Sequence, residues 1–250
     1  AWQCYWFNWT NNVIKNGQAI EDIYTNEILY SQETIMEYAL KYNICPFEYS
    51  LDLSYFCDAI VCDYNYVFDP KAHLIRYFED TEYQPKILCD ESHNLVERSK
   101  DMYSAEFDSL LPLRIEERIS SYDKTITKNV RHFYDELKKY DDLVNKDLFY
   151  YSHLLDDLML SSLKQIVQKA ELVLADNKEI KDRDEILTDY FLLKDFVDTA
   201  EFFGQSHMFV VKKIENNHFQ IEIKCADASD FIYDTVKNKT KGIVFFSATL

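Results

Sequence analysis

Residues 87–95, Ile-Leu-Cys-Asp-Glu-Ser-His-Asn-Leu, decide the fold prediction. The short run 86–89 is largely apolar and bounded by polar residues, which is typical of a strand buried on both faces of a parallel sheet. Two carboxylates, Asp90 and Glu91, and the imidazole of His93 follow directly. Since ligands of open α/β sheets bind at the carboxyl ends of the strands, the stretch predicts an α/β protein with an acidic site at this strand end.

The two neighbouring acids suit the hydrolysis of a nucleoside triphosphate. Asp90 can hold Mg²⁺, usually through water because magnesium dehydrates reluctantly. Glu91 can orient or deprotonate the water that attacks a γ-phosphate. An Asp-Glu pair by itself is more often a solvated helix N-terminus, where the helix dipole favours acids. The preceding strand and His93 favour the hydrolytic interpretation.

Apolar spacing predicts the main elements on either side of this stretch. Residues 12–42 carry apolar side chains at helical spacing and predict two helices, followed by a break at Cys45-Pro46. Residues 59–62, Ala-Ile-Val-Cys, predict a second buried strand, and the helical spacing up to residue 86 would complete a β-α-β unit. Further strands are predicted at 208–214, 219–225 and 243–246.

A long block without glycine extends from about residue 105 to residue 203. Helical spacing predicts helices over 115–140, 148–175 and 184–203. Gly204 stands where a C-cap glycine would end the last of them. We therefore expect this block to be a helical insertion between strands.

Composition excludes several classes of protein. The chain has 250 residues, 3 glycines and a formal charge of −17. Glycines at positions 17, 204 and 242 alone exclude a Rossmann fingerprint and a Walker A loop, GxxxxGK[ST], within these residues. The acidic balance should repel a phosphate backbone unless the cations are clustered. No apolar run reaches the ~18 residues of a membrane span, so we expect a cytoplasmic protein without a membrane partner.

A second signal lies at the end of the sequence. The strand predicted at 243–246 is followed by Ser247-Ala-Thr249. Alone, these hydroxyls would indicate a turn or a helix cap. Together with the acidic stretch, in this order and each at a strand end, they resemble motifs II (DEAH) and III (SAT) of superfamily 2 helicases. Ser92 stands in place of the DEAH alanine, a small-for-small change.

Further motifs follow the order found in one family of these helicases. They are Cys45-Pro-Phe47, Cys62-Asp-Tyr-Asn-Tyr-Val-Phe-Asp-Pro70, Asp90-Glu-Ser-His-Asn-Leu95, Lys224-Cys-Ala-Asp-Ala-Ser229 and Ser247-Ala-Thr249. The string resembles the iron-sulfur helicases of the XPD/DinG type, especially their bacterial members. The resemblance extends over nearly the whole chain, although between 95 and 224 only helical character is shared.

This resemblance implies a fold and a division into domains. The fold would be α/β, a partial RecA-like parallel-sheet motor domain with a large all-helical arch insertion and a remnant of a helical iron-sulfur domain. Residues 1–52 would belong to the cluster domain and 53–104 to the first motor domain with motif II. Residues 105–206 would form the arch, and 207–250 would return to the motor domain and end in motif III.

The resemblance also implies an activity and the residues that carry it. The family activity is ATP-driven 5'-to-3' translocation on single-stranded DNA, in DNA repair or replication. By this likeness Asp90 would be the Mg²⁺ ligand and Glu91 the catalytic base. His93, Ser247 and Thr249 would couple the nucleotide state to DNA contacts.

DNA contacts are expected on two short stretches. Phe47 would stack on a base near the pore of the helicase, and Tyr64, Asn65 and Tyr66 would also face DNA. Packing of these side chains beneath the cluster is an alternative of equal weight.

The six cysteines, at 4, 45, 57, 62, 89 and 225, form no CxxC pair, so a disulfide scaffold is not expected. In the family, the cysteine before Pro-Phe is the last ligand of a 4Fe-4S cluster, which corresponds to Cys45, and Cys4 resembles the ligand before it. Two more ligands would lie upstream, because such a cluster needs four thiolates. Burial as small apolar side chains is the alternative for both.

Two hypotheses follow for the protein as a whole. In the first, the chain is a piece of a helicase whose Walker A loop and second motor domain lie elsewhere, so these residues alone neither hydrolyse ATP nor unwind DNA. In the second, the acidic helical block docks a protein partner on a motor that has lost catalysis. A longer reading frame with a Walker A loop favours the first hypothesis, and a true start near Ala1 favours the second.

Overall fold

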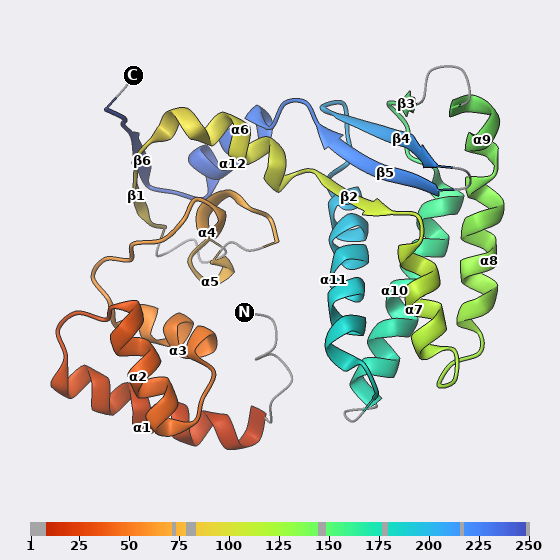
Figure 1. Cartoon of the computed structure of the whole chain (residues 1–250). Helices are drawn as coiled ribbons and strands as arrows, with labels where there is room; N and C mark the ends of the chain where they lie inside the picture. The colour runs from red at the N-terminus through yellow and green to blue at the C-terminus, as the bar shows by residue number, and fades with distance from the viewer. Residues whose placement is uncertain are drawn as a thin grey trace. The chain divides into compact units, whose positions relative to one another are not determined.

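The computed structural model describes residues 9–71, 74–78, 84–144, 149–176, 180–215 and 218–248. The chain divides into two compact units, residues 1–62 and 63–250, whose helices and strands are labelled in Figure 1. Over the described ranges, no helix combines the length and the apolar character that a membrane crossing requires.

The first unit is helical. It contains α1 (Trp9–Asn26), α2 (Gln32–Tyr42), α3 (Pro46–Leu53) and the 3₁₀ turn η2 (Ser54–Phe56), which confirms the two helices predicted over 12–42. Ser31 caps α2 by accepting a hydrogen bond from the Thr34 amide at 3.1 Å, and Pro46 occupies the first turn of α3, where its missing N–H costs nothing. Tyr49 is buried in the core of this unit and donates a hydrogen bond to the Ala19 carbonyl at 2.8 Å.

The strand predicted at residues 59–62 does not form, so this prediction is wrong. Residues 57–63 have no regular structure, and Val61 is fully exposed. An apolar run becomes a strand only when another strand takes up its backbone hydrogen bonds, and none of the described strands pairs with these residues. The β-α-β unit is therefore absent here; α4 (Asn65–Phe68) and α5 (Ile75–Phe78) follow instead. The first compact unit ends at residue 62, and the assignment of residues 1–52 to a cluster domain stays a prediction.

The second unit contains the predicted parallel strands. β1 (Lys86–Cys89) and β6 (Gly242–Phe245) pair in parallel, with Lys86 opposite Gly242 and Cys89 opposite Phe245. α6 (Leu95–Met102), α12 (Ser229–Asn238) and α4 lie beside this pair (Figure 1). Segments more than 150 residues apart in the sequence thus end at the same edge, as the sequence predicted.

The expectation that both faces of this sheet are buried is wrong for the described residues. Cys89 and Ile243 contribute to a small apolar cluster with Leu95, Met102 and other side chains on one face. Leu88 and Val244, which lie opposite each other in the ladder, are 76% and 56% exposed. Because strand side chains alternate between faces, a two-stranded pair with helices packed on one face leaves its other face uncovered.

The insertion predicted to be all helical over residues 105–206 also contains strands, so that prediction is wrong. β2 (Ala105–Asp108), β3 (Phe149–Ser152), β4 (His207–Glu215) and β5 (His218–Cys225) form an antiparallel sheet in the order β2-β5-β4-β3. The predicted strands at 208–214 and 219–225 are confirmed, but they pair with strands of the predicted arch. The helices of this block are α7 (Leu111–Ile119), α8 (Ile126–Leu137), α9 (Lys139–Val144), α10 (Asp157–Asp176) and α11 (Arg183–Thr199), and α11 continues into the 3₁₀ turn η4 (Ala200–Phe202).

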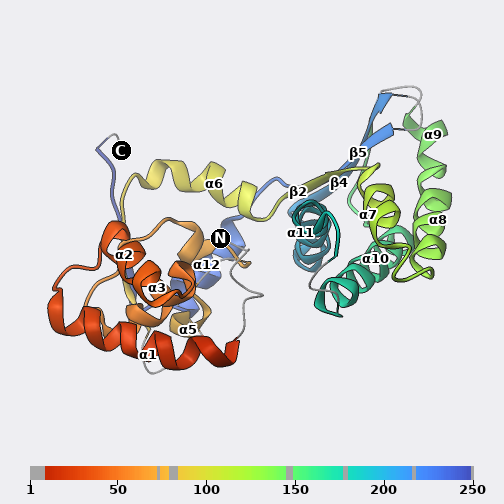
Figure 2. The same cartoon turned by 60° about the horizontal axis from the view of Figure 1, so that its bottom comes forward.

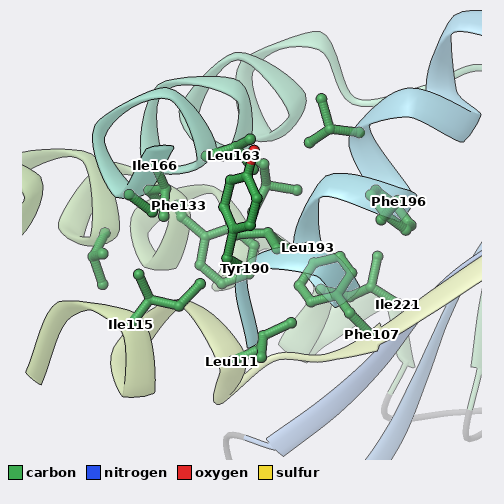
Figure 3. Close-up of a cluster of buried hydrophobic side chains, with 14 of the residues drawn as sticks. Phe107, Leu111, Ile115, Phe133, Leu163, Ile166, Tyr190, Leu193, Phe196 and Ile221 are labelled. Carbon is green, nitrogen blue, oxygen red and sulfur yellow. The ribbon is translucent and has the colours of Figure 1, made fainter. Parts of the chain in front are cut away.

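Helices α7, α8, α10 and α11 lie on one side of this sheet in both views (Figures 1 and 2). Their apolar faces share one core with the inward side chains of the sheet, among them Phe107 and Ile221 (Figure 3). The rings of Phe107 and Phe196 meet edge to face at 4.7 Å. Because β5 is apolar on alternate residues, one of its faces must be buried against other apolar side chains. The helices provide this burial, so residues 207–225 share one core with the helical block.

Two of the long helices predicted in this block are shorter than expected. The predicted helix over 115–140 is divided among α7, α8 and α9. At the first interruption Asp123 accepts hydrogen bonds from the Thr125 amide at 2.8 Å and from its hydroxyl at 2.6 Å, a local pattern that competes with helix. The residues predicted to begin a helix at 148 instead include strand β3.

His207 is fully buried where the core of the mixed block meets the cluster beside β1. Its Nδ1 accepts from the Gly204 amide at 3.3 Å, so Nε2 carries the proton and donates to the Tyr103 carbonyl at 3.2 Å. The rings of Phe203 and Phe231 lie 5.6 and 5.8 Å from the imidazole. Burial lowers the pKa of His207 below its ordinary value of 6.5, because a charged imidazolium would lose its hydration.

We expect His207 to make the folded state sensitive to acid. In the unfolded chain the imidazole of His207 binds a proton with a pKa near 6.5, whereas in the folded state its pKa is lower. The stabilisation is therefore complete above pH 6.5 and is lost as the pH falls below it, by at most ~1.4 kcal/mol per pH unit. Denaturant titrations between pH 7 and pH 5 should give a smaller loss of unfolding free energy for His207→Gln than for wild type. Equal slopes would remove His207 as the cause.

Candidate functional site

The parallel ladder continues past the ends of β1 and β6 and brings two loops together. The Phe246 amide donates to the Cys89 carbonyl at 3.0 Å, and the Ser92 amide donates to the Phe246 carbonyl at 3.1 Å. These bonds place residues 90–93 directly beside residues 246–248. The carboxyl edge of the sheet is thereby built from the two stretches that the sequence singled out.

Glu91, His93 and Ser247 form one cluster of side chains at this edge. The Ser247 hydroxyl donates to Glu91 Oε2 at 3.3 Å, and His93 Nδ1 lies 2.8 Å from the same hydroxyl oxygen. His93 Nδ1 also lies 3.2 Å from Glu91 Oε2. Because the only hydroxyl proton goes to Glu91, Nδ1–H of His93 is the donor to Ser247. Glu91 and His93 are exposed and Ser247 is partly buried, so water and a ligand can reach the carboxylate.

Glu91 adopts a left-handed backbone conformation, with φ 49° and ψ 40°. For a residue with a Cβ this conformation costs about 1–2 kcal/mol, so neighbouring bonds must hold it. The Glu91 amide donates to Asp90 Oδ1 at 2.7 Å, and the Glu91 carbonyl accepts from the Asn94 amide at 3.0 Å. The turn leads into the 3₁₀ helix η3 (Ser92–Asn94) and aims the Glu91 side chain at Ser247.

Asp90 is suited to a water-mediated Mg²⁺ contact. Its side chain is exposed, Oδ1 accepts from the Glu91 amide, and Oδ2 has no hydrogen-bond partner among the described residues. No group of three or more metal-ligating side chains occurs in that part of the chain. Mg²⁺ commonly binds proteins through one or two carboxylates, with waters and substrate phosphates completing the octahedron. The donor set around Asp90 fits that mode.

The predicted iron-sulfur ligands are not assembled among the described residues. Cys45 lies at the N-cap position of α3 and is partly buried, whereas Cys4 lies outside the described residues. Over those residues no group of three or more histidine, cysteine, aspartate or glutamate side chains is placed to hold a metal. The assignment of Cys4 and Cys45 to a 4Fe-4S cluster therefore stays a prediction.

The remaining predicted residues lie in different parts of the structure. Phe47 is in α3 and partly buried, Asn65 at the start of α4 is exposed, and Tyr66 is partly buried. Thr249 lies outside the described residues. Tyr64 precedes α4, and its hydroxyl donates to the backbone carbonyl of Asp90. Their DNA contacts stay predictions.

Sequence reasoning missed Arg98 as a neighbour of this site. Its guanidinium lies 5.3 Å from the centre of the Tyr64 ring, within the range of a cation–π contact. No spacing rule connects residues 64 and 98, because the contact arises only when α4 and α6 pack together. The arginine on α6 one or two turns beyond the acidic stretch is the sole signal in the sequence.

Residues 2–110 match the family model DEAD_2. A stretch of 122 residues, 48% of the chain, is 29% identical to a protein from Dictyostelium discoideum described as general transcription and DNA repair factor IIH helicase subunit XPD. The resemblance to XPD/DinG-type helicases is confirmed. The matched stretch covers 14% of that relative. The family match includes Asp90, Glu91 and His93 and ends at residue 110, whereas Ser247 lies outside it.

Proposed function

We propose that this chain is part of an ATP-dependent DNA helicase that moves 5'-to-3' on single-stranded DNA, in DNA repair or replication. The observation that carries the proposal is the cluster of Glu91, His93 and Ser247 at the carboxyl edge of two parallel strands. The DEAD_2 match over residues 2–110 supports it. Such an edge is where α/β sheets bind their ligands, and ATP would be the ligand here.

In this proposal the two acids have separate roles. A Mg²⁺ ion at Asp90 would neutralise charge on the phosphates of ATP. Glu91 would orient a water molecule and accept its proton as the water attacks the γ-phosphate. The hydrogen bond from Ser247 at 3.3 Å directs Glu91 Oε2 and leaves Oε1 for that water. His93 holds the Ser247 hydroxyl from the other side at 2.8 Å.

The same cluster offers a route for coupling. Glu91 and His93 follow β1, and Ser247 follows β6, so the hydrogen bonds between them connect the ends of two strands. A change at Glu91 as the γ-phosphate leaves would alter the hydrogen bond to Ser247. The residues after β6, including Thr249, would then pass the nucleotide state to the DNA contacts that we assign to Phe47, Tyr64, Asn65 and Tyr66. Stacking of a base on such an aromatic ring contributes about 1–3 kcal/mol.

The phosphate cradle of this helicase must come from sequence other than these 250 residues. The three glycines, at 17, 204 and 242, provide no GxxxxGK[ST] loop. We therefore propose that turnover requires a protein that carries this chain together with a Walker A loop. The test is ATP hydrolysis by that protein after Glu91→Gln, and retained hydrolysis would reject the proposed role of this site.

We further propose that Cys45 is a ligand of a 4Fe-4S cluster, with Cys4 as a second ligand. Cys45→Ser in the longer protein should remove the visible absorbance of the cluster and its bound iron, because the cluster needs four thiolates. The matched control is Cys57→Ser, since the Cys57 thiol is also partly buried but donates to the Leu53 carbonyl at 3.5 Å. An unchanged spectrum for Cys45→Ser, or an equal loss for both variants, would remove Cys45 from the ligand set.

A further inference from the structure

The peptide group between Asp90 and Glu91 is held at both of its polar ends. Its carbonyl accepts a hydrogen bond from the Tyr64 hydroxyl, and its N–H donates to Asp90 Oδ1 at 2.7 Å. The orientation of this peptide plane sets φ of Glu91, which lies at 49°. A residue other than glycine keeps a left-handed backbone conformation only when contacts with the surrounding structure hold it there. Among the described residues, the hydrogen bond from the Tyr64 hydroxyl is the one that reaches this peptide from a distant element.

Tyr64 is itself held in place. Its ring packs against the apolar cluster that contains Phe68, Cys89 and Leu95, and the Arg98 guanidinium lies 5.3 Å from the ring centre. Burial raises the pKa of Tyr64, so the phenol keeps its proton at neutral pH and remains a donor. Contacts with side chains of α4, β1 and α6 therefore fix the Tyr64 ring in the orientation in which its hydroxyl meets the Asp90 carbonyl.

We propose that Tyr64, supported by Arg98, is a positioning residue for the Asp90–Glu91 turn. The inference rests on the proposed function, because it concerns the same carboxylate. Tyr64 acts through the peptide plane: it holds the Asp90 carbonyl, which keeps Glu91 left-handed and its carboxylate beside Ser247. Asn65 and Tyr66, which we assign to DNA, directly follow Tyr64 in the chain. DNA bound at α4 and the hydrolytic carboxylate thus communicate through one hydrogen bond.

The experiment is ATP turnover by a protein that carries this chain and a Walker A loop, with and without single-stranded DNA. Tyr64→Phe removes the hydroxyl and keeps the ring that packs against the core and Arg98. We expect kcat with DNA to fall about tenfold to a hundredfold, as for other small misplacements of catalytic groups, while KM for ATP stays the same. Stimulation by DNA should fall with it. Tyr233→Phe, which alters an exposed tyrosine on α12, should change neither quantity.

A double variant separates positioning from a general loss of structure. Tyr64→Phe added to Glu91→Gln should cause no further loss of turnover, because a residue that acts through Glu91 has nothing left to position. Arg98→Ala should reproduce part of the Tyr64→Phe effect, and Arg98→Lys, which keeps a cation over the ring, should restore it. Unchanged kcat in Tyr64→Phe, or a change confined to KM, would overturn the inference. Retained turnover in Glu91→Gln would instead overturn the proposed function itself, so the two failures are distinguishable.

Discussion

Glu91→Gln should reduce ATP turnover to a small residual rate while nucleotide binding stays largely intact. We expect kcat to fall by about 10² to 10⁴, the usual contribution of a positioned general base. Glutamine has nearly the same shape, and its amide oxygen can still accept the hydrogen bond that Ser247 donates to Glu91. The substitution therefore removes the proton acceptor and leaves the turn and the sheet edge in place. Phosphate release and equilibrium binding of ATP to the same protein measure the two effects.

Glu97→Gln is the matched control for this experiment. Glu97 lies on α6 close to the same edge, is exposed, and pairs with Lys100 at 2.9 Å. An exposed i,i+3 pair contributes only ~0.2–0.5 kcal/mol, so the control should retain full turnover. Equal loss in both variants would point to the charge of the region and would contradict a specific role for Glu91.

Of the substitutions considered for their effect on stability, Phe133→Ala should lower the free energy of unfolding most. Phe133 on α8 is fully buried in the core of the mixed block (Figure 3), where its ring lies 6.1 Å from that of Phe107 and 5.2 Å from that of Tyr134. Truncation of a buried phenylalanine removes its apolar contacts and leaves a cavity, at a cost of about 3–5 kcal/mol. The free energy of unfolding, measured by denaturant titration, should fall by this amount.

Phe149→Ala provides the same chemical change at an exposed position. Phe149 on β3 is 48% exposed, so its loss should change the unfolding free energy by much less than that of Phe133. A similar cost at both positions would mean that Phe133 does not occupy the core that the structure assigns to it.

Some elements could be predicted from residues 86–89, 208–225 and 243–246 because each carries its own apolar pattern. The same pattern failed at Ala59–Cys62, where Val61 is fully exposed and no described strand pairs with the run. Local sequence records apolar character but not the partner that a strand requires. The prediction of an all-helical block was wrong for a related reason. Strand β3 lies within a stretch of helical spacing and becomes a strand by pairing with β4.

The candidate site also contains residues that the sequence predicted and contacts that it did not. Asp90, Glu91, His93 and Ser247 were found from residue type and position at strand ends, because catalytic side chains at a sheet edge follow the strands that carry them. The sequence did not predict that the Tyr64 hydroxyl donates to the Asp90 carbonyl, and the DNA contact predicted for Tyr64 stays a prediction. Arg98 was not considered at all, because its contact with the Tyr64 ring is made by the packing of separate helices.

The amino-acid sequence by itself determined which residues can do chemistry here, since carboxylates, an imidazole and hydroxyls at strand ends are properties of local order along the chain. Only the tertiary structure decided that Glu91, His93 and Ser247 meet within 3.3 Å, and that strands β4 and β5 pack with the helices of the preceding block. The physical reason is that strand pairing and core burial are satisfied by partners far apart in sequence, and no local pattern names those partners.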